Sequence, residues 1–224
     1  MKLSIAIPVY NEEESIEKVL QEIFETIPQI VKDYEIIVVN DGSTDKTKEI
    51  LEKYRDRITI IHHPERKGVG KAIKDALYYA NMEWVLFIPG DGQQPIEEIK
   101  KFLRWVKDYD VLLGYRKKRE DPFYRLIFSF LWRKFLYFLF GLRIRDPNWI
   151  KMIKKQVLEE LKLYSETAFL DTELILKAEK KGYRIKEIGV MGRKRYGGRS
   201  KCLSLSTILK AVRDALYYRR NRRS

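Results

Sequence analysis

The sequence has little of several residues and patterns that mark other classes of protein. Its 224 residues include one cysteine, Cys202, which excludes an internal disulfide and fits a reducing compartment. The two histidines, His62 and His63, have no partners at metal-ligand spacing, so we expect them to end a strand. Apolar runs stay far short of the roughly 20 residues that a helix needs to cross a bilayer. The N-terminus enters a strand pattern directly, and no secretory signal is expected there.

Motifs for phosphate loops and for nucleic acids are also missing. Residues 68–71 read Gly-Val-Gly-Lys, but the full G-x-x-x-x-G-K-[ST] spacing is absent, which excludes a P-loop. The sequence contains no zinc-finger, helix-turn-helix or RNP pattern, so nothing in it favours nucleic-acid binding.

Acidic residues are scarce in the second half of the chain. Residues 1–112 hold 16 basic and 21 acidic residues, whereas residues 113–224 hold 29 basic and 11 acidic ones. The formal net charge of +13 therefore comes from the second half. Such an excess indicates a polyanionic partner, which is a nucleic acid, an anionic membrane surface or a phosphorylated substrate.

Strand and helix patterns alternate through the first half. Short apolar runs predict buried strands at residues 3–9, 34–39, 58–61, 84–88 and 110–113. The segments between them carry apolar residues at helical spacing, and Asn11 is expected to cap the first of these helices. This alternation predicts an α/β fold with a mostly parallel sheet and helices on both faces. The length and the 45% hydrophobic content fit one domain with a C-terminal extension.

Three polar loops come at the ends of predicted strands, at residues 8–10, 41–43 and 90–92. Because the carboxyl ends of parallel strands lie at one edge of a sheet, these loops should surround a single crevice. The second loop begins with Asp41, and a buried acid that faces a crevice can accept the N–H of a nucleobase. By itself, the Asp-Gly-Ser-Thr-Asp sequence at this point is a common turn and cap.

The third loop places Asp91 after Gly90, with Gln93 two positions further on. A carboxylate beside an amide oxygen suits a hard divalent cation that takes its other ligands from water and phosphate. The neighbouring glycines allow a bulky ligand to approach the backbone. An isolated Gly-Asp-Gly is as often a simple turn, but its neighbours here favour a metal ligand.

The second half contains two amphipathic segments. Residues 121–142 are rich in Phe, Leu, Trp and Tyr but are interrupted by basic residues, so they are expected to lie in a membrane interface as helices. Residues 203–218 repeat apolar side chains at helical spacing before the arginine-rich residues 219–223, which are either solvated or attracted to anionic lipid. The basic, glycine-containing residues 195–201 form either a solvated loop or a diphosphate-binding one.

In this order the segments resemble the family 2 glycosyltransferases, and specifically the polyprenyl-phosphate sugar synthases of the dolichyl-phosphate mannose synthase type. The resemblance covers residues 3 to about 201. Its motifs are Ile-Pro-Val-Tyr-Asn-Glu at 7–12, Val-Asn-Asp-Gly-Ser-Thr-Asp at 39–45, the segment 68–72, Gly-Asp-Gly-Gln-Gln-Pro at 90–95, Gly-Tyr-Arg at 114–116, and R-x-x-G-x-S-K at 195–201.

The resemblance implies a GT-A-like, Rossmann-related catalytic domain at residues 1–202, with a nucleotide-binding half at 1–115, an acceptor half at 116–202, and an amphipathic helix with a basic tail at 203–224. It implies a hexosyltransferase that uses Mg²⁺ or Mn²⁺, a nucleotide-diphosphate-sugar donor and a polyprenyl (dolichyl-type) phosphate acceptor, and that inverts the sugar carbon. Such an enzyme would be cytoplasmic and peripheral at the inner face of the cell membrane, without a transmembrane domain.

The resemblance also assigns residues to the donor. The base and ribose would be held by Pro8, Tyr10, Glu12 and Asp41. The metal on the diphosphate would be held by Asp91 and Gln93, beside Gly90, and the diphosphate itself by Arg195, Ser200 and Lys201.

For the acceptor, the resemblance implies that Arg116 and Arg125 grip the lipid phosphate. A phosphate acceptor is largely dianionic at neutral pH, since its second pKa is about 6. It therefore needs no general base. If the acceptor were a sugar hydroxyl, a base would be required, and Asp171 is then the candidate, although it could equally be an ordinary first-turn acid.

Two features depart from the family pattern. Pro89 stands where the usual D-x-D motif has its first acid, and Asp146 leads into Pro-Asn-Trp-Ile without a D-x-x-x-G-[FY] signature. Two other functions stay open. The first is transfer onto a glycan or another hydroxyl acceptor, and the second, in a different class, is a catalytically silent module that binds a membrane surface or a polyanion.

Overall fold

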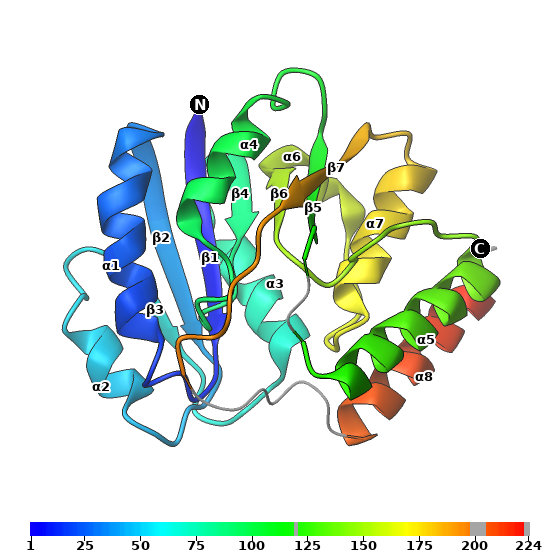
Figure 1. Ribbon diagram of the computed structural model, residues 1–224, viewed down its shortest axis with the longest axis horizontal. Helices are drawn as coiled ribbons and strands as arrows, with labels where there is room; N and C mark the ends of the chain where they lie inside the picture. Colours follow the sequence, from blue (N-terminus) through cyan, green and yellow to red (C-terminus); the bar gives the residue numbers. More distant parts are fainter. Residues whose placement is uncertain (119–120, 198–204, 222–224) are drawn as a thin grey trace.

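A seven-stranded sheet organises the chain (Figure 1). The computed structural model describes residues 1–118, 121–197 and 205–221, and the sheet order is β3-β2-β1-β4-β6-β5-β7. The strands are β1 (Lys2–Val9), β2 (Asp33–Asn40), β3 (Thr59–His62), β4 (Trp84–Phe87), β5 (Val111–Arg116), β6 (Lys151–Lys154) and β7 (Ile185–Val190). Strand β6 runs antiparallel to both its neighbours, and all other pairs are parallel. The predicted mostly parallel sheet is confirmed.

Side chains alternate along the strands between two buried clusters, one on each face of the sheet. On β1, for example, Ile5 and Ile7 belong to one cluster and Ala6 to the other. The first face is covered by α1 (Ile16–Thr26), which continues into η1 (Ile27–Gln29), and by α2 (Thr47–Glu52), η2 (Ile96–Ile99) and α4 (Lys100–Leu103). The second face is covered by α3 (Val69–Tyr79), α6 (Lys155–Leu161) and α7 (Leu170–Lys180). The expected helices on both faces are observed.

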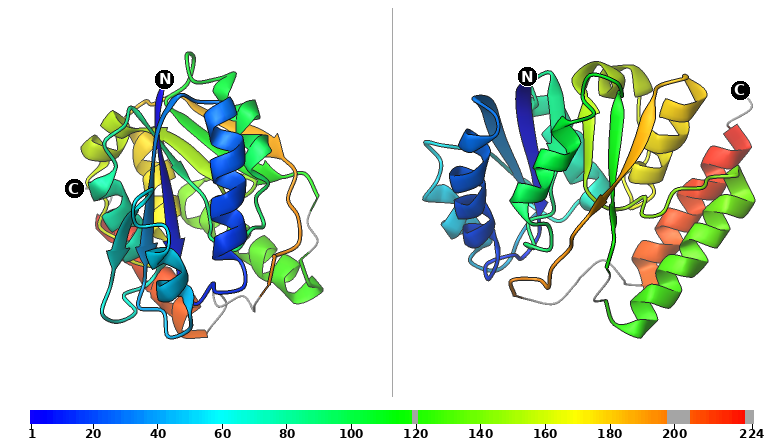
Figure 2. Two further views of the ribbon diagram at one scale, coloured as in Figure 1. Left: turned by 90° about the vertical axis from the view of Figure 1, so that its left-hand side faces the viewer. Right: turned by 45° about the horizontal axis from the view of Figure 1, so that its top comes forward.

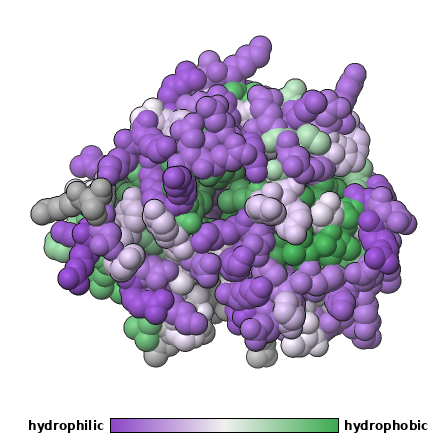
Figure 3. All heavy atoms as spheres, turned by 180° about the vertical axis from the view of Figure 1, so that it is seen from behind, coloured by the Kyte–Doolittle hydropathy of each residue, from purple (hydrophilic) through white to green (hydrophobic). Residues whose placement is uncertain are grey.

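Two long helices, α5 (Phe123–Phe140) and α8 (Leu205–Asn221), lie side by side beyond α7 (Figure 2). The rings of Phe140 on α5 and Tyr218 on α8 are 5.8 Å apart between centroids, and both also contact Phe169. Within the described residues, the two amphipathic segments expected from the sequence are helical over Phe123–Phe140 and Leu205–Asn221. Among the described residues, no helix is both long enough and apolar enough to cross a membrane. The face opposite to that of Figure 1 is largely hydrophilic, with hydrophobic patches between the polar side chains (Figure 3).

The loop after β1 differs from expectation. Asn11 does not cap α1, because that helix begins at Ile16 with Ser15 in the capping position. Asn11 instead has a φ of 53°, in the left-handed region that asparagine tolerates. Its side-chain oxygen accepts a hydrogen bond from the backbone N–H of Thr44 at 2.7 Å. The asparagine thus ties the loops after β1 and β2 together.

The antiparallel strand β6 brings its first residues to the edge where the parallel strands end. Lys151 pairs with Phe87, the last residue of β4, and with Leu113 of β5. The segment that precedes β6 therefore reaches the same edge as the loops that follow β1, β2 and β4.

Candidate active site

The loops after β1, β2 and β4 meet at one edge of the sheet, as the sequence predicts. The backbone N–H of Asp41 donates to the carbonyl of Val9 at 2.9 Å, which joins the first two loops. The hydroxyl of Ser15 donates to the carbonyl of Gly90 at 3.0 Å, which joins the first loop to the third. Every one of these contacts lies at the carboxyl ends of parallel strands, where open α/β folds bind their ligands.

Asp41 is buried and organises the segment that follows β3. Its Oδ1 accepts hydrogen bonds from the backbone N–H of Lys67 and from Nδ1 of His63, both at 2.8 Å. Its Oδ2 accepts from the backbone N–H of Gly68, also at 2.8 Å. Three donors from one loop therefore fix both oxygens of this carboxylate. The sequence did not identify His63 as a partner of Asp41. The only signal for this contact was that His63 follows a predicted strand, as Asp41 does.

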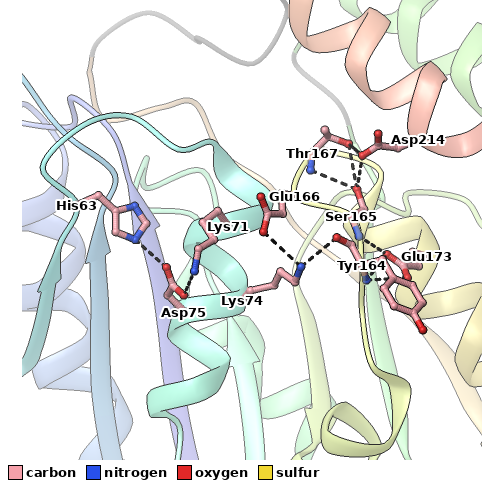
Figure 4. A network of polar contacts seen from close by, with 10 residues as sticks. All are labelled: His63, Lys71, Lys74, Asp75, Tyr164, Ser165, Glu166, Thr167, Glu173 and Asp214. Carbon is pink, nitrogen blue, oxygen red and sulfur yellow. Dashed lines mark hydrogen bonds and ion pairs between the residues drawn. The ribbon is translucent and has the colours of Figure 1, made fainter. Parts of the chain in front are cut away.

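The far side of the His63 ring meets helix α3 (Figure 4). Its Nε2 lies 2.8 Å from Oδ2 of Asp75, and Asp75 also pairs with Lys71 one turn away. Burial alone would raise the pKa of Asp75, but the hydrogen bonds from Lys71 and His63 outweigh it and lower the pKa below 3.8. Asp75 is thus held ionised, and it fixes the histidine between two acids.

The other residues predicted to hold the base and ribose lie on and after β1. Pro8 is within the strand, paired with Val39. The ring of Tyr10 lies under the guanidinium of Arg66, which is 4.2 Å from the ring centroid. Arg66 belongs to the same loop that Asp41 holds, so the loop after β3 brings a cation close to Tyr10.

Asp91, Glu12 and Arg195 form one ion-paired cluster. Asp91 Oδ1 accepts from the backbone N–H of Gln93 at 3.0 Å, and its Oδ2 accepts from Arg195 at 3.2 Å. The other end of the same guanidinium pairs with Glu12. Arg195 therefore links two other residues that the sequence placed on the donor side.

The segment that follows β7 runs across the Asp91 loop. The backbone N–H of Arg193 donates to the carbonyl of Gln93 at 3.0 Å, and the backbone N–H of Tyr196 donates to the carbonyl of Asp91 at 3.2 Å. Gly92 has a φ of +74°, and a Cβ there would lie 2.1 Å from the ring of Tyr196. Only glycine therefore allows this segment to lie so close to the loop.

Asp91 offers a divalent cation one carboxylate, and Gln93, whose backbone N–H bonds to that carboxylate, is the neighbour that would add an amide oxygen. Among the described residues, no group of three or more His, Cys, Asp or Glu side chains could hold a metal ion. The oxygen donor set still fits Mg²⁺ or Mn²⁺, provided that diphosphate and water complete the coordination. The Pro89 position contributes no ligand.

A pocket opens between Gln93 and the end of β5. Its other lining residues are mostly cationic or aromatic, namely Arg116, Lys118, Asp121, Trp149, Gly192, Arg193 and Lys194. Arg116 stacks 4.3 Å from the ring of Trp149 and donates two hydrogen bonds to Asp146, at 2.8 and 3.2 Å. This pocket adjoins the Asp91 loop on the acceptor side predicted from the sequence.

Asp121 joins the two arginines predicted to grip the acceptor phosphate. It accepts from Arg116 at 3.0 Å and from Arg125, on α5, at 3.2 Å. Two of the few acids in the basic half, Asp121 and Asp146, therefore hold Arg116 in place. Their scarcity in that half was the signal that could have singled them out.

Asp171, the candidate base, is committed to an ion pair. Its Oδ1 lies 2.8 Å from Nζ of Lys151, whose side chain is 4% exposed and also donates to the carbonyl of Trp149 at 3.0 Å. Lys151 begins β6, between the ends of β4 and β5, so the pair lies at the same edge as the loops. Sequence reasoning missed Lys151, although a lysine inside a short apolar run was a visible signal.

Two predicted diphosphate ligands, Ser200 and Lys201, lie outside the described residues. The described residues bring the remaining candidates into two neighbouring groups. One contains Glu12, Asp91 and Arg195, and the other contains Arg116 and Arg125, while Asp41 is held separately by the loop after β3.

Residues 4–160 match the sequence model of the family described as Glycosyl transferase family 2, and the chain belongs to that family. The likeness to curated proteins is partial. An undecaprenyl-phosphate 4-deoxy-4-formamido-L-arabinose transferase of Photorhabdus laumondii is 34% identical over 129 residues, which are 55% of this chain and 40% of that protein. This chain therefore spans less than half the length of that relative.

A longer match is to a dolichyl-phosphate beta-glucosyltransferase of Trichomonas vaginalis, ALG5D. It is 29% identical over 98% of this chain and 74% of the relative. Among solved structures, the glucosyl-3-phosphoglycerate synthase of Mycobacterium tuberculosis, in complex with Mn²⁺, UDP and its product, has a TM-score of 0.73 at 20% identity, over 97% of this chain and 79% of that one. This likeness confirms the GT-A-like fold expected from the sequence.

Proposed function

We propose that this chain moves a sugar from a nucleoside diphosphate to a polyprenyl phosphate at the cytoplasmic face of a membrane, with inversion at the sugar carbon. The observation that carries the proposal is a single sheet edge with a donor group around Asp91 and a cationic pocket around Arg116 beside it. The two relatives whose names specify undecaprenyl and dolichyl phosphates support the acceptor class.

On the donor side, Asp91 and Gln93 would hold Mg²⁺ or Mn²⁺ against the diphosphate. Such a cation would supply positive charge where the leaving diphosphate develops negative charge. Arg195 already forms an ion pair with Asp91, and its planar guanidinium would bind the same diphosphate with two hydrogen bonds. The mycobacterial enzyme, whose structure contains UDP and Mn²⁺, supports this donor class.

On the acceptor side, Arg116 and Arg125 would bring the lipid phosphate to the donor sugar. A phosphate oxygen would form the new bond to the sugar carbon while the bond from that carbon to the diphosphate breaks and its electron pair leaves with the diphosphate. Because a dianionic phosphate has no proton to lose, the step needs fixed cations rather than a base. The ion pair of Asp171 with Lys151 fits this reaction, since a hydroxyl acceptor would require that carboxylate to accept a proton.

The helices α5 and α8 would carry the chain to the lipid. Large apolar side chains of α5 are unusually exposed, with Phe123 at 77% and Phe138 at 82%, and Tyr217 of α8 is also exposed. Basic residues such as Lys134 and Arg219 lie on the same helices. Aromatic side chains flanked by cations are typical of helices that lie in an anionic membrane interface.

The proposal is tested by incubating nucleotide sugars with polyprenyl phosphate, with and without Mn²⁺, and scoring glycolipid product. Asp91→Asn should lose about 100-fold or more in turnover because it removes the carboxylate on the metal side. Arg116→Lys should also lose most activity, because an ammonium cannot replace a forked guanidinium. Asp56→Asn and Arg104→Lys, at exposed positions away from the site, are the matched controls. Product formation on free sugars but not on lipid phosphates would refute the acceptor assignment.

Membrane binding is tested separately by sedimentation with phosphatidylcholine vesicles that contain or lack phosphatidylglycerol. The chain should bind the anionic vesicles, and salt should weaken this binding. The double variant Phe123→Ser/Phe138→Ser should bind less, whereas Tyr78→Ser, which changes an equally exposed aromatic residue on α3, should not. Equal binding by all three proteins would count against an interfacial role for α5.

A further inference from the structure

His63 is a buried histidine that the proposed reaction does not use. It is 7% exposed, and its two ring nitrogens face Asp41 and Asp75, each at 2.8 Å. Both ring nitrogens therefore face carboxylate oxygens, and with the ring proton assigned to Nδ1 the ring donates to Oδ1 of Asp41. His63 therefore acts through the acids that it contacts.

The contacts of Asp41 leave its carboxylate one acceptor position. Each carboxylate oxygen offers about two lone-pair sites. Oδ1 is filled, because it accepts from both His63 and the backbone N–H of Lys67. Oδ2 accepts only from the backbone N–H of Gly68, so it can take one more donor. With 5% of the Asp41 side chain exposed, a ligand can reach only a narrow edge of this group.

We propose that His63 determines the specificity for the donor base by filling Oδ1 of Asp41, so that the site takes uracil or thymine and rejects guanine. This inference rests on the proposed function, in which the donor is a nucleoside diphosphate sugar and Asp41 meets its base. It adds the class of base and assigns a role to a positioning residue that does not itself touch the donor.

The chemistry of the bases gives the selectivity. Uracil and thymine present one ring N–H between two carbonyl groups, which matches a single free acceptor position. Guanine presents a ring N–H beside an amino group, and a carboxylate accepts both only when each oxygen has a free position. Adenine and cytosine place a ring nitrogen lone pair beside their amino group, and an ionised carboxylate repels it. Arg66 on the same loop supplies a cation that suits the carbonyl oxygens of uracil.

Helix α3 prevents the His63 ring from moving aside (Figure 4). Asp75 holds the ring and is itself held by Lys71. The start of the helix is pressed against the segment before α7, since a Cβ on Gly70 would lie 2.3 Å from the carbonyl carbon of Glu166. Lys74 adds a hydrogen bond to the carbonyl of Tyr164 at 3.0 Å. The packing around α3 therefore keeps the His63 ring against Oδ1 of Asp41.

The test measures dissociation constants of the full chain for UDP, dTDP and GDP by calorimetry in the presence of Mn²⁺. Wild-type protein should bind UDP and dTDP about tenfold or more tightly than GDP, because guanine leaves a donor unpaired. His63→Leu should bring the dissociation constant for GDP closer to those for UDP and dTDP, since Oδ1 of Asp41 then has a free acceptor position. His63→Asn keeps an N–H near the position of Nδ1 and should preserve the ratio. His62→Leu is the control, because the ring of His62 contacts Asn40 and Glu52 instead.

A ratio of constants measured on one preparation does not depend on the folded fraction, so partial misfolding of a variant does not obscure the result. The inference is overturned if wild-type protein binds GDP as well as UDP, or if His63→Leu leaves the ratio unchanged. If none of the three nucleotides binds, the proposed donor class fails and the inference falls with it. Binding of all three with equal affinity would leave the donor class standing and overturn the base selectivity alone.

Discussion

Replacing Lys151 by methionine should destabilise the fold by removing one partner of a buried ion pair. The ammonium lies 2.8 Å from Asp171 and 3.0 Å from the carbonyl of Trp149, and the two side chains of the pair are 4% and 14% exposed. Methionine keeps most of the apolar stem of lysine. The change therefore isolates the loss of the charge and its hydrogen bonds.

The magnitude follows from what is left behind. Removing one partner of a buried pair typically costs about 3–5 kcal/mol, because the other charge stays buried without compensation. Asp171 keeps some contact with water, which places the cost near the lower end, at about 3 kcal/mol. The double variant Lys151→Met/Asp171→Asn should be more stable than the sum of the two single changes predicts, by up to about 3 kcal/mol, since neither charge then remains.

The assay is urea unfolding followed by circular dichroism for the wild type, both single variants and the double variant. Lys107→Met, at an exposed position, is the matched control and should change the free energy of unfolding by less than about 0.5 kcal/mol. A cost below about 1 kcal/mol for Lys151→Met would show that the pair does not behave as a buried one. Additive effects in the cycle would refute the coupling between the two residues.

Three further outcomes are expected. Asp171→Asn should reduce transfer to polyprenyl phosphate by less than about tenfold in a turnover assay, whereas the loss of a general base costs about 10²–10⁴-fold. Gly70→Ala should lower the free energy of unfolding by about 1–3 kcal/mol in a urea titration, because its Cβ would collide with the backbone of Glu166. Burial alone would raise the pKa values of Asp75 and Asp110, but hydrogen bonds from neighbouring groups lower both below 3.8. The two ionised carboxylates therefore stabilise the folded state above about pH 4, and this stabilisation is lost as the pH falls further. The urea midpoint should accordingly drop between pH 5 and pH 3. A midpoint that stays constant over this range would contradict the lowered pKa values.

Strands β1, β2 and β4 were predictable because each contains an apolar run that is buried on both faces of the sheet. The antiparallel strand β6 was not, since Lys151–Lys154 is only four residues long and has a lysine at each end. Its pairing with β4 and β5 is set by the sheet around it. Asn11 was assigned the wrong role for a similar reason, because its side chain bonds to Thr44 on a distant loop rather than to its own helix.

The loops of the candidate site were predictable from the rule that parallel strands end at one edge. The charge pairs within that site were not, because they join segments far apart in the sequence. Asp41 and His63 are 22 positions apart, and Asp91 and Arg195 are 104 apart. A sequence pattern shows that such residues share an edge, but only packing decides which oxygen faces which nitrogen.

The guanidinium of Arg195, which bridges Asp91 and Glu12, has a kinetic consequence. In the free protein this arginine occupies the carboxylate that a divalent cation would use, so a metal ion arriving alone must compete with it. A bound diphosphate would offer Arg195 another anion and would leave Asp91 available to the cation. We therefore expect cation and nucleotide to enter as one complex, so that initial rates follow the concentration of the metal–nucleotide complex rather than that of either component.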